Sequence, residues 1–388
     1  MLATALLFLQ LQAVALPVDS GWALTGTDTR IESHRGLRSI AIDNGRATRH
    51  DVRLEDGTIE FDVELTDARS FVYLQFRMES ETEYEEIYFR PHKSELPDAV
   101  QYNPVWRDDS FWQLWHGPGA TAAPRFRSGE WMHVRLVLHG ARAALFLAAD
   151  TAPALVIPLA RAPRAGYIAL RAFTPAVAEL RGRRAARFAN VVVRPRDVSY
   201  AFPAAVAAAA PEAGAILHWQ ISPAFPATKA AITTLASDLL VGRERWPSYP
   251  VEATGVVAIG RHLQRPRPDG AAIARLVIRS TGERLQRLQL GYSDYVTVFV
   301  NGRALFSGDA HYSFDRPRQE GLITRTQATL WLPLRDGENE ILLVVVDGFG
   351  GWGLTGRLEP TDGGVLVPTA GISHNSRSPT EPPPLISR

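Results

Sequence analysis

The fold is decided by residues 57–117, which contain GTIEFDVEL (57–65), FVYLQFRM (71–78), YEEIYFRPH (84–92), AVQYNPVW (99–106) and SFWQLWHG (110–117). Each segment is short, rich in aromatic and β-branched residues, and alternates between apolar and polar side chains. Successive side chains of a strand point to opposite faces of a sheet. The stretch therefore predicts consecutive half-buried β-strands.

The alternation assigns the polar side chains of these strands to one face of a sheet. In YEEIYFRPH, for example, Ile87 and Phe89 alternate with Tyr88. Planar amides, guanidinium groups and flat rings on one face suit a polyhydroxylated ligand, so we predict a sugar-binding face. Its predicted members are Gln75, Arg77, Glu86, Tyr88, Arg90, Gln101, Gln113 and Trp115, joined by Trp352 from a glycine-rich loop.

The composition is that of a globular protein, and several functional classes are already disfavoured. The 388 residues suffice for two ordinary domains, and 46% are hydrophobic. A net charge of +1 gives no electrostatic reason to expect nucleic acid or an anionic membrane as partner. The absence of cysteine excludes disulfides, thiolate metal sites and cysteine nucleophiles.

The N-terminus has the features of a secretory signal. Residues 2–15 are apolar but too short to span a bilayer as a helix, and Ala13 and Ala15 form an A-x-A cleavage pattern. We therefore predict a signal peptide over residues 1–15 and a periplasmic or secreted protein that does not touch the membrane after cleavage. A misassigned start or a short buried N-terminal helix is the alternative, because no Lys or Arg precedes the apolar run.

The remaining chain predicts an all-β protein made of two β-sandwich (jelly-roll) domains. Short alternating segments continue to Pro195 with no sustained helical period, and composition then shifts to Ala and Pro. A second set of strands follows, with hairpin signals at Asn301-Gly302 and Asp336-Gly337. We predict a first sandwich over residues 21–197, a linker over 198–215, a second sandwich over 216–361 and a disordered tail over 362–388.

Five stretches of the first predicted domain form a pattern: GTIEFDV (57–63), FVYLQFR (71–77), YEEIYFRPH (84–92), GEWMHVRLVLHG (129–140) and FANVVV (188–193). This pattern resembles the concanavalin A-like lectin/glucanase superfamily, in particular its laminin-G-like and 3-keto-disaccharide hydrolase (family-16-like) members. The resemblance covers roughly residues 21–195. It implies a β-sandwich and a link to carbohydrates.

The second domain carries VFVNGRALF (298–306) and LRDGENEILLVVV (334–346). These segments are similar to galactose-binding-like jelly rolls, such as the accessory domains of β-galactosidases. Some members of that superfamily bind sugar, and many only pack against a neighbouring module. The resemblance therefore implies a fold and leaves the role of this domain open.

Two sets of carboxylates are candidates for catalysis. Glu60, Asp62 and Glu64 match the E-x-D-x-E pattern of family-16 glucanases, but the motif comes too early in the chain, so we predict a solvated strand face. Glu86 occupies the corresponding place and is the weak catalytic candidate. His92 is a conceivable base, although an isolated His is more often structural.

The aromatic and acidic residues outside these strands have structural alternatives. The alternation of side chains along the predicted strand places Trp112 in the core and Trp115 on the ligand face. Trp352 could be an exposed ring that stacks on a sugar, or it could cover the core of the second domain. Asp294, Asp309 and Asp315 carry the oxygen donors that calcium prefers. Their spacing matches no dedicated site, so we predict turn capping, no metal and no cofactor.

The sequence thus favours an exported carbohydrate-binding protein. Two alternatives stay open, namely a glycoside hydrolase or related glycan-processing enzyme, and a non-catalytic assembly module. An enzyme should show a deep groove with two carboxyls at catalytic separation. A lectin should show exposed rings with few carboxylates, and an assembly module should show neither.

Overall fold

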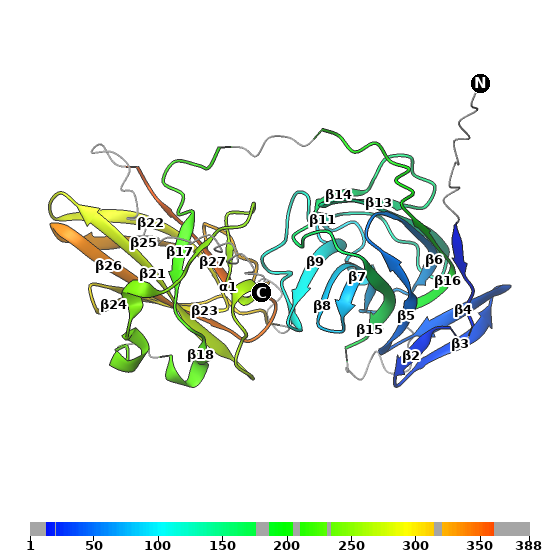
Figure 1. The fold of residues 1–388 in the computed structure, drawn as a ribbon, viewed down its shortest axis with the longest axis horizontal. Helices are drawn as coiled ribbons and strands as arrows, with labels where there is room; N and C mark the ends of the chain where they lie inside the picture. Colours follow the sequence, from blue (N-terminus) through cyan, green and yellow to red (C-terminus); the bar gives the residue numbers. More distant parts are fainter. Residues whose placement is uncertain are drawn as a thin grey trace, which may run out of the picture.

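The computed structural model describes residues 13–19, 21–175, 186–204, 210–230, 234–313 and 320–360. It confirms the all-β prediction, and Figure 1 shows two strand-rich halves side by side, one formed by β1–β16 and the other by β17–β27. Residues 1–12 of the predicted signal and the predicted tail lie outside the described residues. Cleavage after Ala15 would cut within β1 (Val14–Leu16), which pairs with β16.

The N-terminal half is a sandwich of two antiparallel sheets. One sheet has the order β14 (Leu155–Pro158), β13 (Arg142–Leu147), β12 (Trp131–His139), β6 (Gly57–Leu65), β16 (Ala186–Pro195), β4 (Leu37–Ile42), β3 (Thr29–His34). The other has the order β10 (Asp109–Ser110), β9 (Val100–Trp106), β8 (Glu83–Phe89), β7 (Phe71–Ser80), β15 (Gly166–Phe173), β5 (Gly45–Leu54), β2 (Ala23–Gly26). Short β11 (Thr121–Ala122) pairs with β9, and η1 (Pro91–Lys93) follows β8.

The C-terminal half is a second sandwich. Its larger sheet has the order β19 (Ser248–Pro250), β17 (His218–Ile221), β21 (Gly270–Ser280), β26 (Gly337–Asp347), β23 (Tyr295–Val300), β24 (Arg303–Asp309), and β18 (Phe225–Pro226) pairs with β21. Its smaller sheet has the order β20 (Val257–Ala258), β27 (Gly353–Leu358), β22 (Arg284–Ser293), β25 (Ala328–Leu334). The short helices are η3 (Ala227–Lys229), η4 (Ser237–Leu240), η5 (Arg243–Arg245) and α1 (Ile259–His262).

Period-two alternation explains both cores. Phe76 of β7 and Phe89 of β8 point between the two N-terminal sheets and are fully buried, together with Phe61 of β6. Trp219 and Trp352 are fully buried in the second core. The predicted Asn301-Gly302 hairpin is confirmed, since both residues have positive φ between β23 and β24.

The last predicted strand, residues 110–117, is wrong beyond its first residue. Only Asp109–Ser110 pair with β9. The backbone then turns, and the Leu114 and Trp115 amides both donate to the carbonyl oxygen of Phe111, at 3.0 and 3.2 Å. The two-residue alternation of a strand does not apply to a turn, so the assignment of Trp112 and Trp115 to opposite faces of the sheet is wrong.

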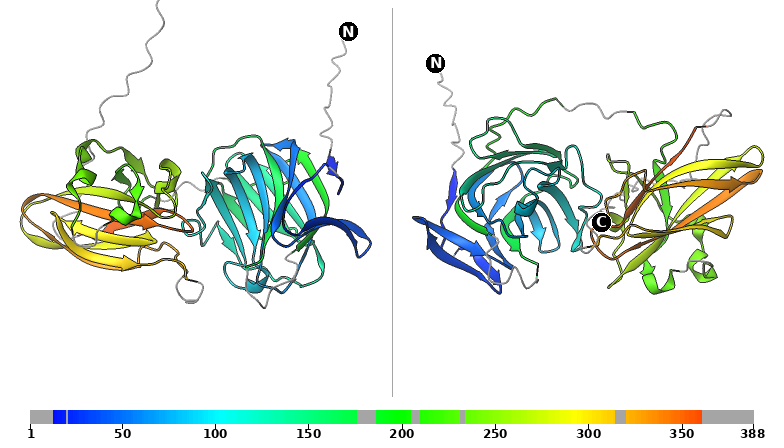
Figure 2. Two further views of the ribbon diagram at one scale, coloured as in Figure 1. Left: turned by 90° about the horizontal axis from the view of Figure 1, so that it is seen from below. Right: turned by 180° about the vertical axis from the view of Figure 1, so that it is seen from behind.

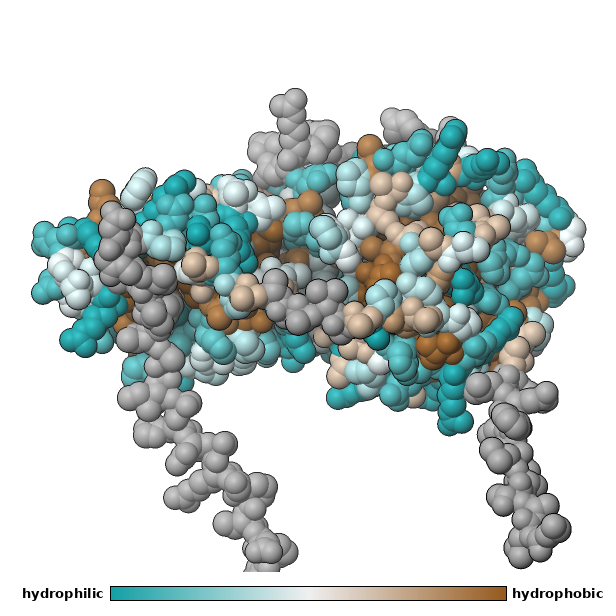
Figure 3. All heavy atoms as spheres, turned by 90° about the horizontal axis from the view of Figure 1, so that it is seen from above, coloured by the Kyte–Doolittle hydropathy of each residue, from teal (hydrophilic) through white to brown (hydrophobic). Residues whose placement is uncertain are grey.

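The two sandwiches pack against each other and appear as one elongated body in the space-filling view, with a visible face that is mostly hydrophilic (Figure 3). The turns on either side of β10 mediate this contact. Arg107 Nη1 donates to the carbonyl oxygens of Gly260 and Arg261, at 3.0 and 2.9 Å, and the Gln113 amide donates to Gly350, at 3.0 Å. Figure 2 shows the two halves next to each other from two further sides.

Apolar packing continues across the same contact. Val256, Ala258 and Ile323 of the C-terminal half belong to the core cluster that also holds Phe111 and Trp115. Among the described residues, no helix combines the length and apolar character that crossing a bilayer requires.

Candidate functional site

A cavity of about 540 Å³ lies where the two sandwiches meet. Its floor is one face of the β7–β8–β9–β15 part of the sheet, which we call the pocket face and define by Tyr73, Glu86, Tyr88, Asn103 and Arg171. Its far wall comes from the C-terminal half, through Tyr312, Glu320, Leu322 and Phe349. The volume falls within the range of about 300–1,000 Å³ that is usual for small-molecule sites.

Glu86 lies in the floor of this pocket with both carboxyl oxygens occupied. Gln75 Nε2 donates to Oε2, at 2.9 Å, and Asn103 Nδ2 donates to Oε1, at 2.8 Å. The backbone amide of Phe111 in turn donates to Asn103 Oδ1, at 2.8 Å, and this bond fixes the orientation of the Asn103 side chain. Burial raises the pKa of Glu86, while the charge of Arg171 and the two amide donors oppose that rise.

Three tyrosines surround Glu86. The Tyr73 and Tyr88 rings lie 5.3 Å apart between centroids, and Tyr84 lines the same floor. Burial raises the pKa of Tyr73 to about 12 and also raises the pKa of Tyr84 and Tyr88. All three phenols therefore stay protonated at neutral pH, where each can donate one hydrogen bond and accept others.

Arg90 and Gln101 form a buried network beside the tyrosines. Gln101 Oε1 accepts from the Tyr88 hydroxyl, at 2.6 Å, and from Arg90 Nη2, at 2.7 Å. Arg90 also donates to the carbonyl oxygen of Asp98, at 2.7 Å, and pairs with its carboxylate, at 3.0 Å. Arg90 is only 5% exposed, so it belongs to a buried, paired network and not to an open surface.

Three aromatic rings form the side of the pocket. Trp112 lies 5.6 Å from Tyr312 and 6.2 Å from Phe349 between ring centroids, and Tyr312 and Phe349 are 6.0 Å apart. Phe349 is 58% exposed. The prediction that Trp112 belongs to the core is therefore wrong, because the turn after β10 directs it into the pocket instead.

His92 also lines the pocket, but its surroundings disfavour the charged form. Burial, followed by the charges of Arg69 and Arg90, lowers the pKa of His92 to about 4. Its ring packs edge-on against Phe71, with centroids 5.5 Å apart. At neutral pH this His is therefore an uncharged ring in the pocket wall.

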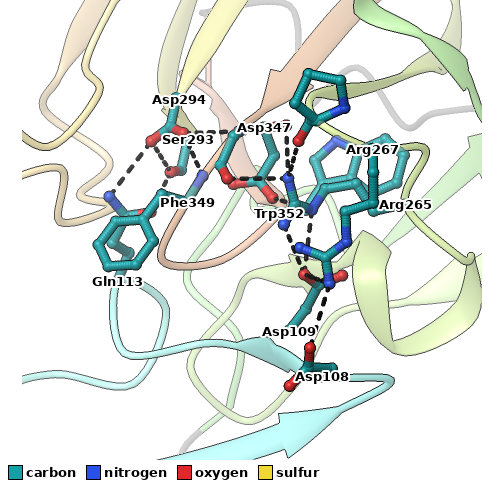
Figure 4. Close-up of polar contacts among 12 residues, drawn as sticks. Asp108, Asp109, Gln113, Arg265, Arg267, Ser293, Asp294, Asp347, Phe349 and Trp352 are labelled. Atoms are coloured by element: carbon teal, nitrogen blue, oxygen red, sulfur yellow. Dashed lines mark hydrogen bonds and ion pairs between the residues drawn. The ribbon is translucent and has the colours of Figure 1, made fainter. Parts of the chain in front are cut away.

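A polar cluster between the halves holds the far wall in place (Figure 4). Asp294 accepts from the Gly348 and Phe349 amides, at 3.0 and 3.1 Å, and from Gln113 Nε2, at 3.3 Å. Nearby, Arg265 Nη2 donates to Asp109, at 2.7 Å, and its Nε pairs with Asp347, at 3.2 Å. The loop that carries Phe349 is thus tied to the N-terminal sandwich by side chains from both halves.

The structure brings together only part of the predicted ligand set. Glu86, Tyr88 and Arg90 line the pocket, whereas Gln75 and Gln101 lie within the sheet and hold other side chains there. Gln113 is fully buried in the contact between the halves, where it also accepts from the Ser293 hydroxyl.

Three predicted ligand residues have structural roles instead. Trp115 is 5% exposed within the first core, and Trp352 is a plug, 1% exposed, whose Nε1 donates to Val345, at 3.1 Å. Arg77 faces away from the pocket, because a bulge in β7 with φ of +48° at this residue reverses the alternation. Its guanidinium donates to the carbonyl oxygens of Glu55 and Gly140, both at 2.8 Å.

The E-x-D-x-E residues lie on β6 of the other sheet and are engaged in pairs. Glu60 pairs with Arg194 at 2.9 Å, Asp62 with His133 at 2.8 Å, and Glu64 with Arg187 at 2.9 Å. They are a polar strand face, as predicted, although Glu64 is buried.

The three loop aspartates considered as possible calcium ligands do not form one cluster. Asp294 caps backbone amides, Asp309 pairs with His311, and Asp315 lies outside the described residues. Within the part of the chain that the structure describes, no group of three or more His, Asp or Glu side chains could hold a metal ion.

Several pocket residues were missed by the sequence analysis. Arg171 interrupts the otherwise apolar strand GYIALRAF (166–173), and this single charge was a usable signal. Tyr73 alternates with the buried Val72 and Leu74 and could have been found by parity. Tyr312 and Phe349 come from loops of the other half, and no sequence pattern connects them to the pocket.

No family model matches the chain, and no curated protein sequence matches it significantly. Solved structures to which part of the chain is similar include a carbohydrate-binding module from Bacillus subtilis (15% identity, 44% of this chain and 93% of that chain, TM-score 0.33). They also include a β-glucanase from Bacillus licheniformis (10%, 47% and 98%, 0.35) and a galectin from Caenorhabditis elegans (10%, 42% and 94%, 0.27). Each likeness extends over less than half of this chain.

Proposed function

We propose that the chain is a carbohydrate-binding protein whose ligand occupies the pocket between the two sandwiches. The observation that carries this proposal is the pairing of a polar floor with an aromatic side. Glu86 and the tyrosine hydroxyls offer donors and acceptors for sugar hydroxyls, and Trp112 and Phe349 offer flat apolar faces for the C–H side of a sugar ring. The ligand would therefore touch both halves of the protein.

Export is part of the same proposal. The apolar segment at residues 2–15 and its A-x-A pattern support a secretory signal, and a glycan receptor is useful where extracellular or periplasmic glycans are present. The protein would meet its ligand in the periplasm or the medium, without a nucleic-acid or membrane partner.

Binding can be tested with a glycan array probed by the full chain, followed by titration calorimetry on the hits. Trp112→Ala should weaken binding by at least about tenfold, roughly 1.4 kcal/mol, because the ring is one of the three aromatic rings that form the side of the pocket. Trp331→Ala is the matched control, since this Trp is 56% exposed on β25 and does not line the pocket.

Equal affinity in the Trp112 and Trp331 variants would place the glycan elsewhere and overturn the site. Absence of binding to every glycan would overturn the proposed function itself. Thermal melting of both variants accompanies the titrations, so that a loss of folded protein is not counted as a loss of affinity.

A glycan-processing enzyme is the second candidate, and the environment of Glu86 favours it. A carboxyl whose pKa is raised by burial and which faces a ligand pocket is suited to act as a general acid. Its expected second carboxylate would come from Asp98 or Asp108, which line the same pocket. Glu86→Gln should abolish product release from a bound glycan while leaving affinity within about threefold; release that persists in this variant would reject Glu86 as the acid.

A further inference from the structure

Two arginines face each other directly across neighbouring strands beside the pocket. In the register of β15 and β5, Arg171 is the partner of Arg46, and in the register of β15 and β7 it is the partner of Tyr73. Side chains opposite one another in a sheet lie on the same face, about 4.5–5.5 Å apart at Cβ, and like charges in such pairs are destabilising. Such a pair therefore needs opposite charges or other compensating contacts nearby.

The two charges are not neutralised equally. Arg46 pairs with Glu81, which is 55% exposed in the turn between β7 and β8. Arg171 instead lies over the Tyr73 ring, with its guanidinium carbon 4.5 Å from the ring centroid. Among the described residues, no ion pair joins Arg171 to a carboxylate. Arginine cannot lose its proton in a protein, so this charge persists at every physiological pH.

Two other cations of the pocket, Arg90 and Lys93, have carboxylate partners close by. Arg90 pairs with Asp98, at 3.0 Å, and Lys93 lies between Asp98 and Glu320, at 2.5 and 3.3 Å. Glu86, the carboxyl whose charge influences Arg171 most, already accepts hydrogen bonds from Gln75 and Asn103 at its two oxygens. Arg171 is thus better placed than Arg90 and Lys93 to receive an anion from outside the protein.

Arg171 also stands where two cavities meet. The second cavity, of about 410 Å³, is lined by Thr25, Gly26, Asn44, Gly45 and Ala172, and shares Arg46, Arg171 and Phe173 with the pocket between the sandwiches. A ligand that filled both would pass directly over the two guanidinium groups. Phe173, 40% exposed, offers an apolar surface at the same point.

We propose that the site takes an acidic oligosaccharide, with a carboxylate or sulfate group held by Arg171 and Arg46 and further sugar units in the adjoining cavity. This inference rests on the proposed carbohydrate-binding function and adds the charge and the length of the ligand. A guanidinium group can hold either oxyanion through paired N–H donors. The probes used in the test distinguish binding of a carboxylate from binding of a sulfate group.

The test is a titration of the full chain with four probes. Tetragalacturonic acid supplies carboxylates, its fully methyl-esterified form removes the charge from the same backbone, galacturonic acid is too short to reach both cavities, and a sulfated galactan tetrasaccharide supplies sulfate esters. At least one acidic tetrasaccharide should bind at least tenfold more tightly than the methyl ester and the monosaccharide. Its affinity should fall with added NaCl, because exposed parts of a charge pair are screened.

Three variants locate the anion. Arg171→Gln should lose at least tenfold in affinity for the acidic probe, and Arg171→Lys, which keeps the charge, should lose less. Arg135→Gln is the matched control, because Arg135 also lies over an aromatic ring, that of Phe146, on the other sheet. Since Arg171→Gln removes a like-charge pair, its melting temperature should equal or exceed that of the wild type, so impaired folding would not account for the loss.

The outcomes distinguish a failure of the acidic-ligand proposal from a failure of the proposed carbohydrate binding. Equal binding of acidic and esterified probes, or an unchanged affinity in Arg171→Gln, overturns the acidic ligand and leaves carbohydrate binding intact. Binding to neutral glycans only, with loss in Trp112→Ala, has the same meaning. Failure to bind any glycan, acidic or neutral, overturns both.

Discussion

At the scale of single residues, Arg90 shows how the surroundings of a side chain change its expected role. Placed by alternation on an open face, it would contribute only to ligand binding. In the structure its guanidinium holds Gln101, the Asp98 carbonyl and the Asp98 carboxylate. Its removal would take one of two donors from the buried Gln101 Oε1 and the guanidinium donor from the Asp98 carbonyl, which is costlier than the loss of a solvated contact.

We therefore predict that Arg90→Ala lowers the free energy of unfolding by about 1–3 kcal/mol, measured by urea denaturation. Arg30→Ala is the control, because Arg30 is about half exposed and pairs with Asp28 on the surface. That variant should stay within about 0.5 kcal/mol of the wild type. An Arg90 variant as stable as the Arg30 variant would contradict the buried network.

The sequence allowed Glu86, Tyr88 and Arg90 to be assigned to one face because β8 is a regular strand, in which period two holds at every residue. It also separated them correctly from the core residues Ile87 and Phe89. Alternation cannot tell whether such a face is open or covered. Whether the face is covered depends on the second sandwich, and the residues of that sandwich that contact the first one are far away in the chain.

At the scale of secondary-structure elements, errors arose where an element departed from regularity. Arg77 adopts a left-handed conformation in a bulge, which reversed the parity of the end of β7 and placed Met78 beside Tyr84 and Tyr167. The segment after Ser110 turned where a strand was expected, which exchanged the roles of Trp112 and Trp115. Both departures depend on backbone geometry, which side-chain alternation does not encode.

The loop between β26 and β27 provides a prediction at this scale. Gly351 has φ of +138°, and a Cβ there would lie 2.5 Å from Leu114 Cδ1 and 3.2 Å from Phe111 Cα. Gly351→Ala should therefore destabilise the protein by about 1–3 kcal/mol through backbone strain alone, with the clash in addition. It should also weaken glycan binding, because the same loop carries Phe349.

Gly302→Ala separates backbone strain from the clash. Gly302 also has a positive φ, of +81°, but a Cβ at this position would meet nothing within 4 Å. Thermal melts and glycan titrations of the two variants should show the larger loss of stability, and the only loss of affinity, for Gly351→Ala. Equal effects would mean that this loop does not depend on its contact with the N-terminal half.

At the scale of the whole molecule, the contact between the sandwiches contains a carboxyl with an unusual proton affinity. Burial raises the pKa of Asp347 from 3.8 to about 8, and the neighbouring Asp294 and Asp109 add to this rise. Arg265 opposes it, but its closest contact, at 2.7 Å, is with Asp109. The folded protein therefore retains the Asp347 proton at pH values where the unfolded chain has lost it.

The sign of the pH dependence follows from this difference. Because the folded state binds the extra proton, the contribution of Asp347 to stability should be greatest below about pH 4 and should decline as the pH rises to about 8. Asp347→Asn should reduce this decline, and above pH 8 it should be more stable than the wild type. Each pKa unit of difference between the states corresponds to about 1.4 kcal/mol.

Melting temperatures measured from pH 4 to 9 check this prediction. Asp336→Asn, which changes an exposed turn carboxyl in the same sandwich, is the control and should leave the pH profile unchanged. A profile for Asp347→Asn that parallels the wild type would show that Asp347 is ionised in the folded protein throughout this range.

The arrangement of Trp112 on one sandwich and Phe349 on the other has a thermodynamic consequence. A ligand that contacts both halves binds their associated arrangement more tightly than a separated one, and it then stabilises that association by the same factor. Ligand occupancy and contact between the halves are thus reciprocal: each increases the other. Through this coupling, a ligand that fills the pocket would hold the two sandwiches together, and a variant that loosens their contact would bind that ligand more weakly.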